Sequence, residues 1–214
     1  GQLLTASATI VEGVATFTEL GLIGRVETPT QSAEVYTLQF GYGGFSTSPS
    51  IGISVMHNVA TQISLLTEAA GGRSGLTFTT KPQVVLLDRF GNRVFKDAAV
   101  SLVGNPVVLS GSGSAAKVNN NNGARDSAGV YTFDMGISGL VGNTYGINFL
   151  RVNGDLSPAS QTGITISHGD AEKIGFIPLP SATDSNQVRT KTGQNLLVQP
   201  VIEIQDAVGN RVLD

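Results

Sequence analysis

Short stretches of alternating or continuous apolar residues, separated by Gly, Asn, Asp and Ser, run through the whole chain. Tyr36–Phe40 alternates with a period of two, while Gln83–Leu87 contains a continuous apolar run typical of a strand buried on both faces. No stretch shows the apolar period of an amphipathic helix. The pattern predicts an all-β protein. The predicted strands are Gly13–Phe17, Tyr36–Phe40, Ile51–Val55, Thr61–Leu65, Gln83–Leu87, Ala99–Val103, Gly129–Phe133, Tyr145–Phe149, Gly163–Ser167 and Glu172–Phe176.

Much of this pattern occurs twice. The stretch Lys81–Val94 returns in altered form as Gln199–Val212, and Asp88 and Asp206 are 118 residues apart (206 − 88). Gly13–Phe17 returns in the same way as Gly129–Phe133. A spacing of this size is that of a small all-β domain, so the chain is predicted to be part of a tandem array.

The repeats predict three parts. Residues 59–168 form a complete unit of about seven short strands, the pattern of an immunoglobulin-like β-sandwich. Residues 1–58 correspond to the C-terminal half of a preceding unit, and residues 169–214 to the N-terminal half of a following one. Half of a sandwich exposes apolar faces and unpaired strand edges, so we expect a head-to-tail neighbour or further sequence to complete each half.

The composition of the chain argues against several classes of partner and site. Charged residues make up only 14% of the chain, the net charge is −3, and acidic and basic residues are scattered. Nucleic acid is therefore not an expected partner, because phosphate backbones require clustered Lys and Arg. There is no cysteine, hence no disulfide framework or thiolate site, and no apolar run long enough to insert in a membrane. No cofactor is expected, and the Ser/Thr-rich surface suits O-linked glycans.

The repeated motifs resemble a known group of proteins. The Gln-Pro-Val-x-x-x-x-Asp-x-x-Gly-Asn-x-Val stretch and the Gly-Val-Ala-Thr-Phe strand are similar to those in tandem immunoglobulin-like repeats of giant extracellular and cell-surface proteins. The resemblance extends to bacterial adhesin and invasin-type repeats and, more distantly, to filamin. It implies an extracellular or cell-surface location and a fold used for stalks, shafts and adhesive tips alike.

The best candidates for a specific local role lie in the turns of the two repeated stretches, Lys81–Val94 and Gln199–Val212. Each has an aspartate followed by Gly-Asn, which predicts a structural turn whose carboxylate caps nearby backbone N–H groups. These residues are Asp88, Gly91, Asn92, Asp206, Gly209 and Asn210. The alternative is an interdomain calcium ion bound by Asp88, Asp206 and Asp170 or Glu172, although the ligand pattern of an EF-hand is absent.

The only two histidines occupy matching positions in the bridges between units. His57 precedes Ala60, and His168 precedes Ala171, by three residues each. The structural interpretation is an imidazole hydrogen-bonded locally at the end of a strand. The functional alternative is a pH-sensitive angle between units, because imidazole titrates near neutrality.

Two further segments are predicted to be loops. Tyr42 and Phe45, in Gly41–Phe45, are the best candidates for an exposed aromatic contact with a partner. The polar stretch Ser110–Asn122 is expected to be a long loop without strands.

These observations favour a non-catalytic structural segment of a long repeat protein, forming an extracellular rod or fibre shaft. Its expected partners are copies of itself or adjacent repeats of the same chain, head-to-tail or side by side. The alternative is an adhesive or ligand-binding stalk module that uses loops at the domain ends. An enzyme is not expected, because no catalytic arrangement stands out in the sequence.

Overall fold

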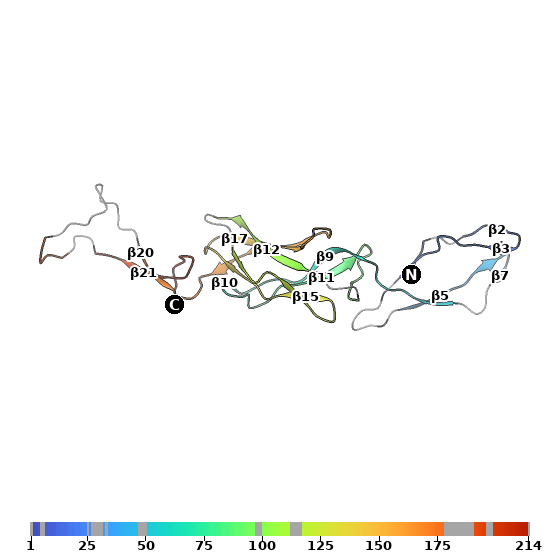
Figure 1. Cartoon of the computed structure of the whole chain (residues 1–214), viewed down its shortest axis with the longest axis horizontal. Helices are drawn as coiled ribbons and strands as arrows, with labels where there is room; N and C mark the ends of the chain where they lie inside the picture. The colour runs from blue at the N-terminus through green and yellow to red at the C-terminus, as the bar shows by residue number, and fades with distance from the viewer. Residues whose placement is uncertain are drawn as a thin grey trace.

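A computed structural model describes residues 2–4, 7–24, 26, 32, 34–46, 51–96, 100–111, 117–177, 191–195 and 199–213. In this part of the chain every regular element is a β-strand, which confirms the all-β prediction. Three groups of strands follow one another along the longest axis of the molecule (Figure 1). We refer to them as the N-terminal segment (residues 1–58), the central unit (59–168) and the C-terminal segment (169–214).

The central unit contains the two largest sheets. The first has the order β14-β15-β11-β9 and the second the order β12-β17-β18, and neighbouring strands are antiparallel in both. The strands of the first sheet are β9 (Ala60–Thr67), β11 (Gln83–Asp88), β14 (Gly123–Arg125) and β15 (Val130–Phe133). Those of the second are β12 (Leu102–Ser110), β17 (Thr144–Arg151) and β18 (Ala159–Ile164).

Two smaller pairs join the central unit. Strands β13 (Lys117–Asn119) and β16 (Gly136–Ser138) form an antiparallel pair. Strands β10 (Gly72–Arg73) and β19 (Ile166–Ser167) form the parallel pair that lies next to the C-terminal segment.

The core of the central unit draws side chains from both large sheets. Val84 and Leu86 of β11 and Phe133 of β15 belong to one buried cluster with Ile147 and Phe149 of β17. The alternating burial of β15 and the nearly continuous burial of β11 follow from their apolar patterns. The Phe133 and Phe149 rings pack in a tilted arrangement with centroids 5.0 Å apart.

The outer segments have only two-stranded sheets among their described residues. In the N-terminal segment β1 pairs with β4, β2 with β3, β5 with β8 and β6 with β7. These strands are β1 (Gln2–Leu3), β2 (Ile10–Val11), β3 (Val14–Ala15), β4 (Leu22–Ile23), β5 (Val35–Leu38), β6 (Gly41–Tyr42), β7 (Phe45–Ser46) and β8 (Ile51–Ser54). In the C-terminal segment β20 (Lys173–Phe176) pairs with β21 (Ile202–Gln205).

Two of the outer pairs, β20–β21 and β5–β8, reproduce registers of the central unit. Ile174 faces Ile204 across β20 and β21, as Ile63 faces Leu86 across β9 and β11. Tyr36 faces Ile53 across β5 and β8, as Tyr145 faces Ile164 across β17 and β18. Because a one-residue slip would turn every side chain to the other face, matching registers mean that corresponding residues occupy corresponding faces.

The structure corrects three local predictions. The segment Gly41–Phe45, expected to be a loop, contains β6 and the start of β7, which pair as a hairpin. The strand expected at Ala99–Val103 begins at Leu102 and runs to Ser110, while Ala99 itself lies outside the described residues. The stretch Ser110–Asn122, expected to be a loop, contains β13, whose three residues pair with β16. Lys117–Asn119 lacks the apolar alternation that would indicate a strand in the sequence, and backbone pairing with β16 forms it.

In the described ranges there is no helix with the length and apolar character needed to cross a membrane.

Phe133→Ala should destabilise the central unit by about 3–5 kcal/mol, the usual cost of removing a fully buried phenylalanine. Chemical denaturation monitored by circular dichroism measures this free energy of unfolding. Tyr42→Ala, which truncates an exposed ring in the N-terminal segment, is the control and should leave the transition of the central unit in place. Equal effects of both changes would contradict the assignment of the core.

Candidate functional site at the junctions between units

Asp88 ends β11 and binds the backbone of the turn that follows it. Its Oδ1 accepts hydrogen bonds from the N–H groups of Phe90 and Asn92, both at 2.9 Å. Its Oδ2 accepts one from the side-chain amide of Asn92 at 3.1 Å and one from the backbone N–H of Asn58 at 2.9 Å. Gly91 has φ +81°, a conformation that favours glycine, so the Asp-x-x-Gly-Asn spacing suits this turn.

Asp206 makes the same arrangement at the end of β21. Its Oδ1 accepts bonds from the N–H groups of Val208, Gly209 and Asn210 at 3.0, 2.9 and 2.9 Å. Its Oδ2 accepts bonds from the Asn210 side chain and from the N–H of Gly169, both at 2.8 Å. Gly209 has φ +106°.

In both places the second carboxylate oxygen reaches outside the turn. Asn58 and Gly169 each follow a bridge histidine, at the point where the chain enters the next unit. Each aspartate therefore ties its turn to the linker that precedes its own unit. We call this four- or five-bond arrangement the junction clasp; the first junction is His57–Ala60 and the second is His168–Ala171.

Both histidines also take part in local bonding. His57 Nδ1 lies 3.1 Å from the carbonyl oxygen of Asn58, and its Nε2 accepts the Lys96 N–H at 3.2 Å. His168 Nδ1 lies 2.9 Å from the carbonyl oxygen of Gly169, and its Nε2 lies 3.0 Å from that of Leu213. These contacts agree with a locally bonded imidazole at a strand end; a pH-sensitive angle between units stays a prediction.

The bridge alanines differ in their surroundings. Ala60 opens β9, pairs with Asp88 and packs partly buried against the core, whereas Ala171 is exposed.

The second junction has further contacts between the central unit and the C-terminal segment. The Asn210 side chain donates to the carbonyl oxygen of Gly139 and accepts the N–H of Val141, both at 2.8 Å. The Ser74 hydroxyl, which is buried, donates to the same Gly139 oxygen at 3.0 Å. Arg73 forms an exposed ion pair with Asp170 at 2.9 Å. Asn210 thus bonds both to Asp206 in its own turn and to the neighbouring central unit.

Sequence reasoning missed Asn58, Ser74 and Gly139. Asn58 contributes its backbone N–H and Gly139 its backbone carbonyl oxygen. Every residue type has this carbonyl and nearly every type has this N–H, so the sequence alone does not single out these two positions. Gly169 has a steric requirement of its own, because a Cβ at this position would collide with the carbonyl oxygen of Ser74.

The carboxylate oxygens of Asp88 and Asp206, which are candidate calcium ligands, accept the hydrogen bonds of the two clasps. Asp88 and Asp206 face N–H donors, whereas a cation requires oxygen lone pairs that are not already bonded to hydrogen. Asp170 pairs with Arg73 and, with Glu172 and Asp206, lines a hollow of about 70 Å³. Within the described ranges, no group of three or more His, Asp or Glu side chains is placed to hold a metal ion.

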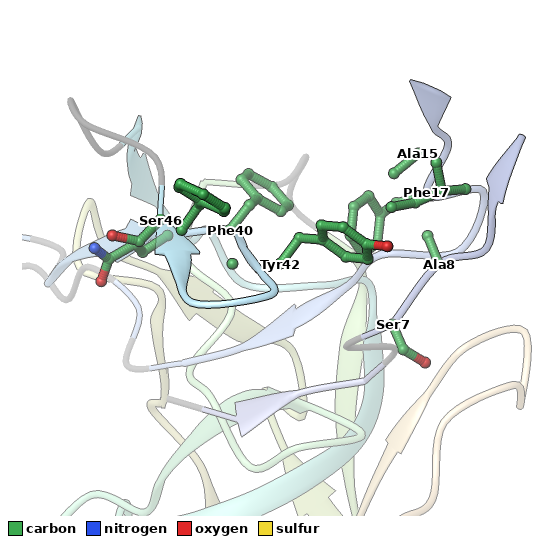
Figure 2. A pocket seen from close by; sticks show the side chains of 11 residues that line it. Ser7, Ala8, Ala15, Phe17, Phe40, Tyr42 and Ser46 are labelled. Carbon is green, nitrogen blue, oxygen red and sulfur yellow. The ribbon is translucent and has the colours of Figure 1, made fainter. Parts of the chain in front are cut away.

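Tyr42 and Phe45 lie away from the junctions. They face each other across the β6–β7 hairpin, and their side chains are 73% and 81% exposed. Tyr42 and Phe45 line a hollow of about 460 Å³ together with Phe17 and Phe40 (Figure 2).

No protein-family model, curated protein or solved structure matches this chain.

The carboxylates give the clasps a defined pH dependence. Burial by itself raises the pKa of Asp88 and of Asp206, but the hydrogen bonds from the linker and turn N–H groups and from Asn92 or Asn210 outweigh it. Both pKa values are therefore lowered from the ordinary value of 3.8. A lowered folded-state pKa stabilises the fold fully above the unfolded-state pKa, and this contribution is lost as pH falls through the folded-state pKa.

Asp206→Asn should remove this part of the pH dependence at the second junction. In the parent chain, protection of the Gly169 amide against hydrogen exchange should be constant above about pH 4 and fall below it. In the variant, protection should be weak at neutral pH and change little as pH is lowered. Asp155→Asn, at an exposed carboxylate, is the control. Parallel pH profiles in the parent chain and the Asp206 variant would contradict the clasp.

Asn210→Ala should loosen the second junction. The N–H of Val141 loses its partner, so its hydrogen exchange should accelerate by about tenfold, the equivalent of one net hydrogen bond. Asn92→Ala is the matched control, because it removes the same bond to a turn aspartate without touching Val141. Acceleration of equal size in both variants would show that Asn210 has no specific role at the junction.

Proposed function

We propose that this chain is a non-catalytic structural segment of a long repeat protein, and that its clasped units form part of an extracellular rod or fibre shaft. The main support for this proposal is that the same clasp occurs at both junctions. The Oδ2 atoms of Asp88 and Asp206 accept equivalent hydrogen bonds from the linkers. The clasp fastens each of these two units in the same way to the linker that precedes it, as a shaft of equivalent units requires.

We also propose that each complete unit is an immunoglobulin-like β-sandwich. The four-stranded and three-stranded sheets of the central unit share one core, and the strands are short and antiparallel. These features support a sandwich of two packed sheets.

The buried polar groups support a structural role. Gln161 donates to the carbonyl oxygen of Ala69 at 2.9 Å and accepts its N–H at 2.7 Å, so it replaces a backbone pairing inside the core. Ser74, Asp88, Asp206 and Asn210 bond to backbone groups as described above. Side chains engaged in this way hold the fold together and are not free to bind or activate a substrate.

The expected stiffness follows from the short linkers. At the second junction the two bonds of Asn210 and the Arg73–Asp170 pair join the C-terminal segment to the central unit. Low charge over the surface opposes lateral packing of neighbouring shafts only weakly. The extracellular location follows from the resemblance to surface repeats.

A second candidate function is an adhesive stalk module. The observation in its favour is the β6–β7 hairpin, which holds Tyr42 and Phe45 in an exposed position. Tyrosine side chains combine apolar area with a hydrogen-bonding group and are common in recognition surfaces. Under this hypothesis, Tyr42→Ala would abolish binding of the parent protein to its target and leave its shape unchanged.

Small-angle X-ray scattering tests the rod. A compact protein of 214 residues has a radius of gyration of about 17 Å. The proposal predicts a clearly larger value, with a distance distribution that has the long tail of an elongated particle. Asp206→Ala combined with Asn210→Ala should shift the curve toward that of a flexible chain. A compact parent protein, or a double variant with an unchanged curve, would contradict a shaft built on clasped junctions.

A further inference from the structure

The first and last strands of the central unit run side by side and in the same direction. The chain enters this unit through β9 and leaves it through β19. Gln62 of β9 pairs in parallel with Ser157, and β10 pairs in parallel with β19 so that Gly72 faces Ile166. The two pairs are separated by nearly the same number of residues, 95 (157 − 62) and 94 (166 − 72). The two strand runs therefore keep one alignment along the unit.

Backbone hydrogen bonds join these runs at both ends. The Ser157 N–H donates to the Thr61 carbonyl oxygen at 3.1 Å, and the Ile63 N–H donates to the Ser157 carbonyl oxygen at 2.9 Å. At the other end, the Ser74 N–H donates to the Ser167 carbonyl oxygen at 2.9 Å. The first and last strands are thus bonded directly to each other, and not only through the strands that lie between them in the sequence.

Gln161 joins the same two runs between these ends. The Ala69 N–H donates to its Oε1 at 2.7 Å, and its Nε2 donates to the Ala69 carbonyl oxygen at 2.9 Å. Both residues are buried, so the Ala69 backbone groups would be left without a partner if the Gln161 amide were removed. One side chain therefore bonds the two runs in the interval where β9 has ended and β10 has not yet begun.

Gly72 allows the close approach of β10 to β19. A Cβ at this position would lie 2.9 Å from Cγ2 of Ile166 and 2.9 Å from a ring carbon of Phe78. Ile166 and Phe78 are both buried, so a side chain at position 72 would push the two strands apart.

We propose that these two bonded runs, residues 61–74 and 157–167, form a terminal-strand clamp that resists tension applied along the shaft. This inference rests on the proposed function, because a shaft transmits load through the points where the chain enters and leaves each unit. It assigns the load to particular hydrogen bonds of the central unit.

The parallel direction of the two runs determines how the clamp is loaded. Tension pulls the start of β9 and the end of β19 in opposite directions, along the strands. Hydrogen bonds between strands run across them, so this load shears the bonds, and all of them must yield before the strands slide. Two antiparallel strands pulled apart at one end instead lose their bonds one after another. Forced unfolding is governed by the rate of crossing such a barrier, so the direction of pulling should matter.

The clamp is continuous with the second junction. Ser74, whose N–H belongs to the clamp, donates its hydroxyl to the Gly139 carbonyl oxygen, which also accepts the Asn210 side chain. Arg73 of β10 forms the ion pair with Asp170. A load that arrives from the C-terminal segment therefore reaches residues of the clamp directly.

Single-molecule stretching in two directions tests the clamp. The natural chain has no cysteine, so two introduced cysteines can hold the handles in the full chain. Met56→Cys with Ala171→Cys, both at exposed positions, loads the clamp in shear. Met56→Cys with Arg89→Cys, also exposed, pulls β9 from β11 at the Ala60–Asp88 pair. At one constant force, the lifetime before extension should be about tenfold longer or more in the first direction, because several hydrogen bonds must break together.

Gln161→Ala should shorten the lifetime in the first direction by about tenfold or more, since two buried backbone groups lose their partner. Its effect in the second direction should be much smaller. Gln83→Ala is the matched control: its amide also makes two hydrogen bonds, but to Thr67 and Thr132, which connect β11 with β9 and β15. The control should change the first lifetime by less than about threefold, the equivalent of a weak net hydrogen bond.

Equal lifetimes in the two directions would overturn the inference, and so would an effect of Gln161→Ala no larger than that of Gln83→Ala. The comparison of directions changes only exposed positions, so it decides the inference even if Gln161→Ala does not fold. Elongated scattering together with equal lifetimes would leave the proposed shaft standing and reject the clamp. Compact scattering together with a longer lifetime in the first direction would reject the shaft and support the clamp, so the two failures are distinguishable.

Discussion

The arrangement of this chain depends on a buried carboxylate whose two oxygens have different tasks. One oxygen closes the turn after a core strand, and the other binds the backbone of the linker that leads into the same unit. A buried carboxylate without partners would be strongly disfavoured, so the turn and the linker must both be in place for either to be stable. The core strand, the turn and the junction are thereby coupled through one side chain in each unit.

This coupling explains why the junctions are short and alike while the loops differ. An insertion in a surface loop leaves the strand ladders unchanged, whereas an insertion between His57 and Ala60 would move Asn58 away from Asp88. At the second junction, Asn210 also bonds to the neighbouring central unit, through Gly139 and Val141. Asn92, its counterpart, has the same bond to its own aspartate.

The sequence predicted the strands best where apolar residues alternate or run together, as in β11, β15 and β17. It also located the turn aspartates and the bridge histidines, because Asp-x-x-Gly-Asn and the histidine spacing recur. It missed β13, which has little apolar character. It also missed the linker N–H groups that bind the aspartates, because a backbone donor is present in almost every residue type. Phe45, predicted to be an exposed contact residue, is 81% exposed on the β6–β7 hairpin.

Under the proposed function, consecutive units keep a fixed relation to one another. Residual dipolar couplings of backbone N–H groups, measured separately for the central unit and the β20–β21 hairpin in one weakly aligned sample, report on this relation. A fixed relation predicts one common alignment tensor for both sets, with the hairpin couplings as large as those of the central unit. Hairpin couplings averaged to a small fraction of the central ones would contradict it, because they would show that the carboxylate binds the linker without fixing the next unit.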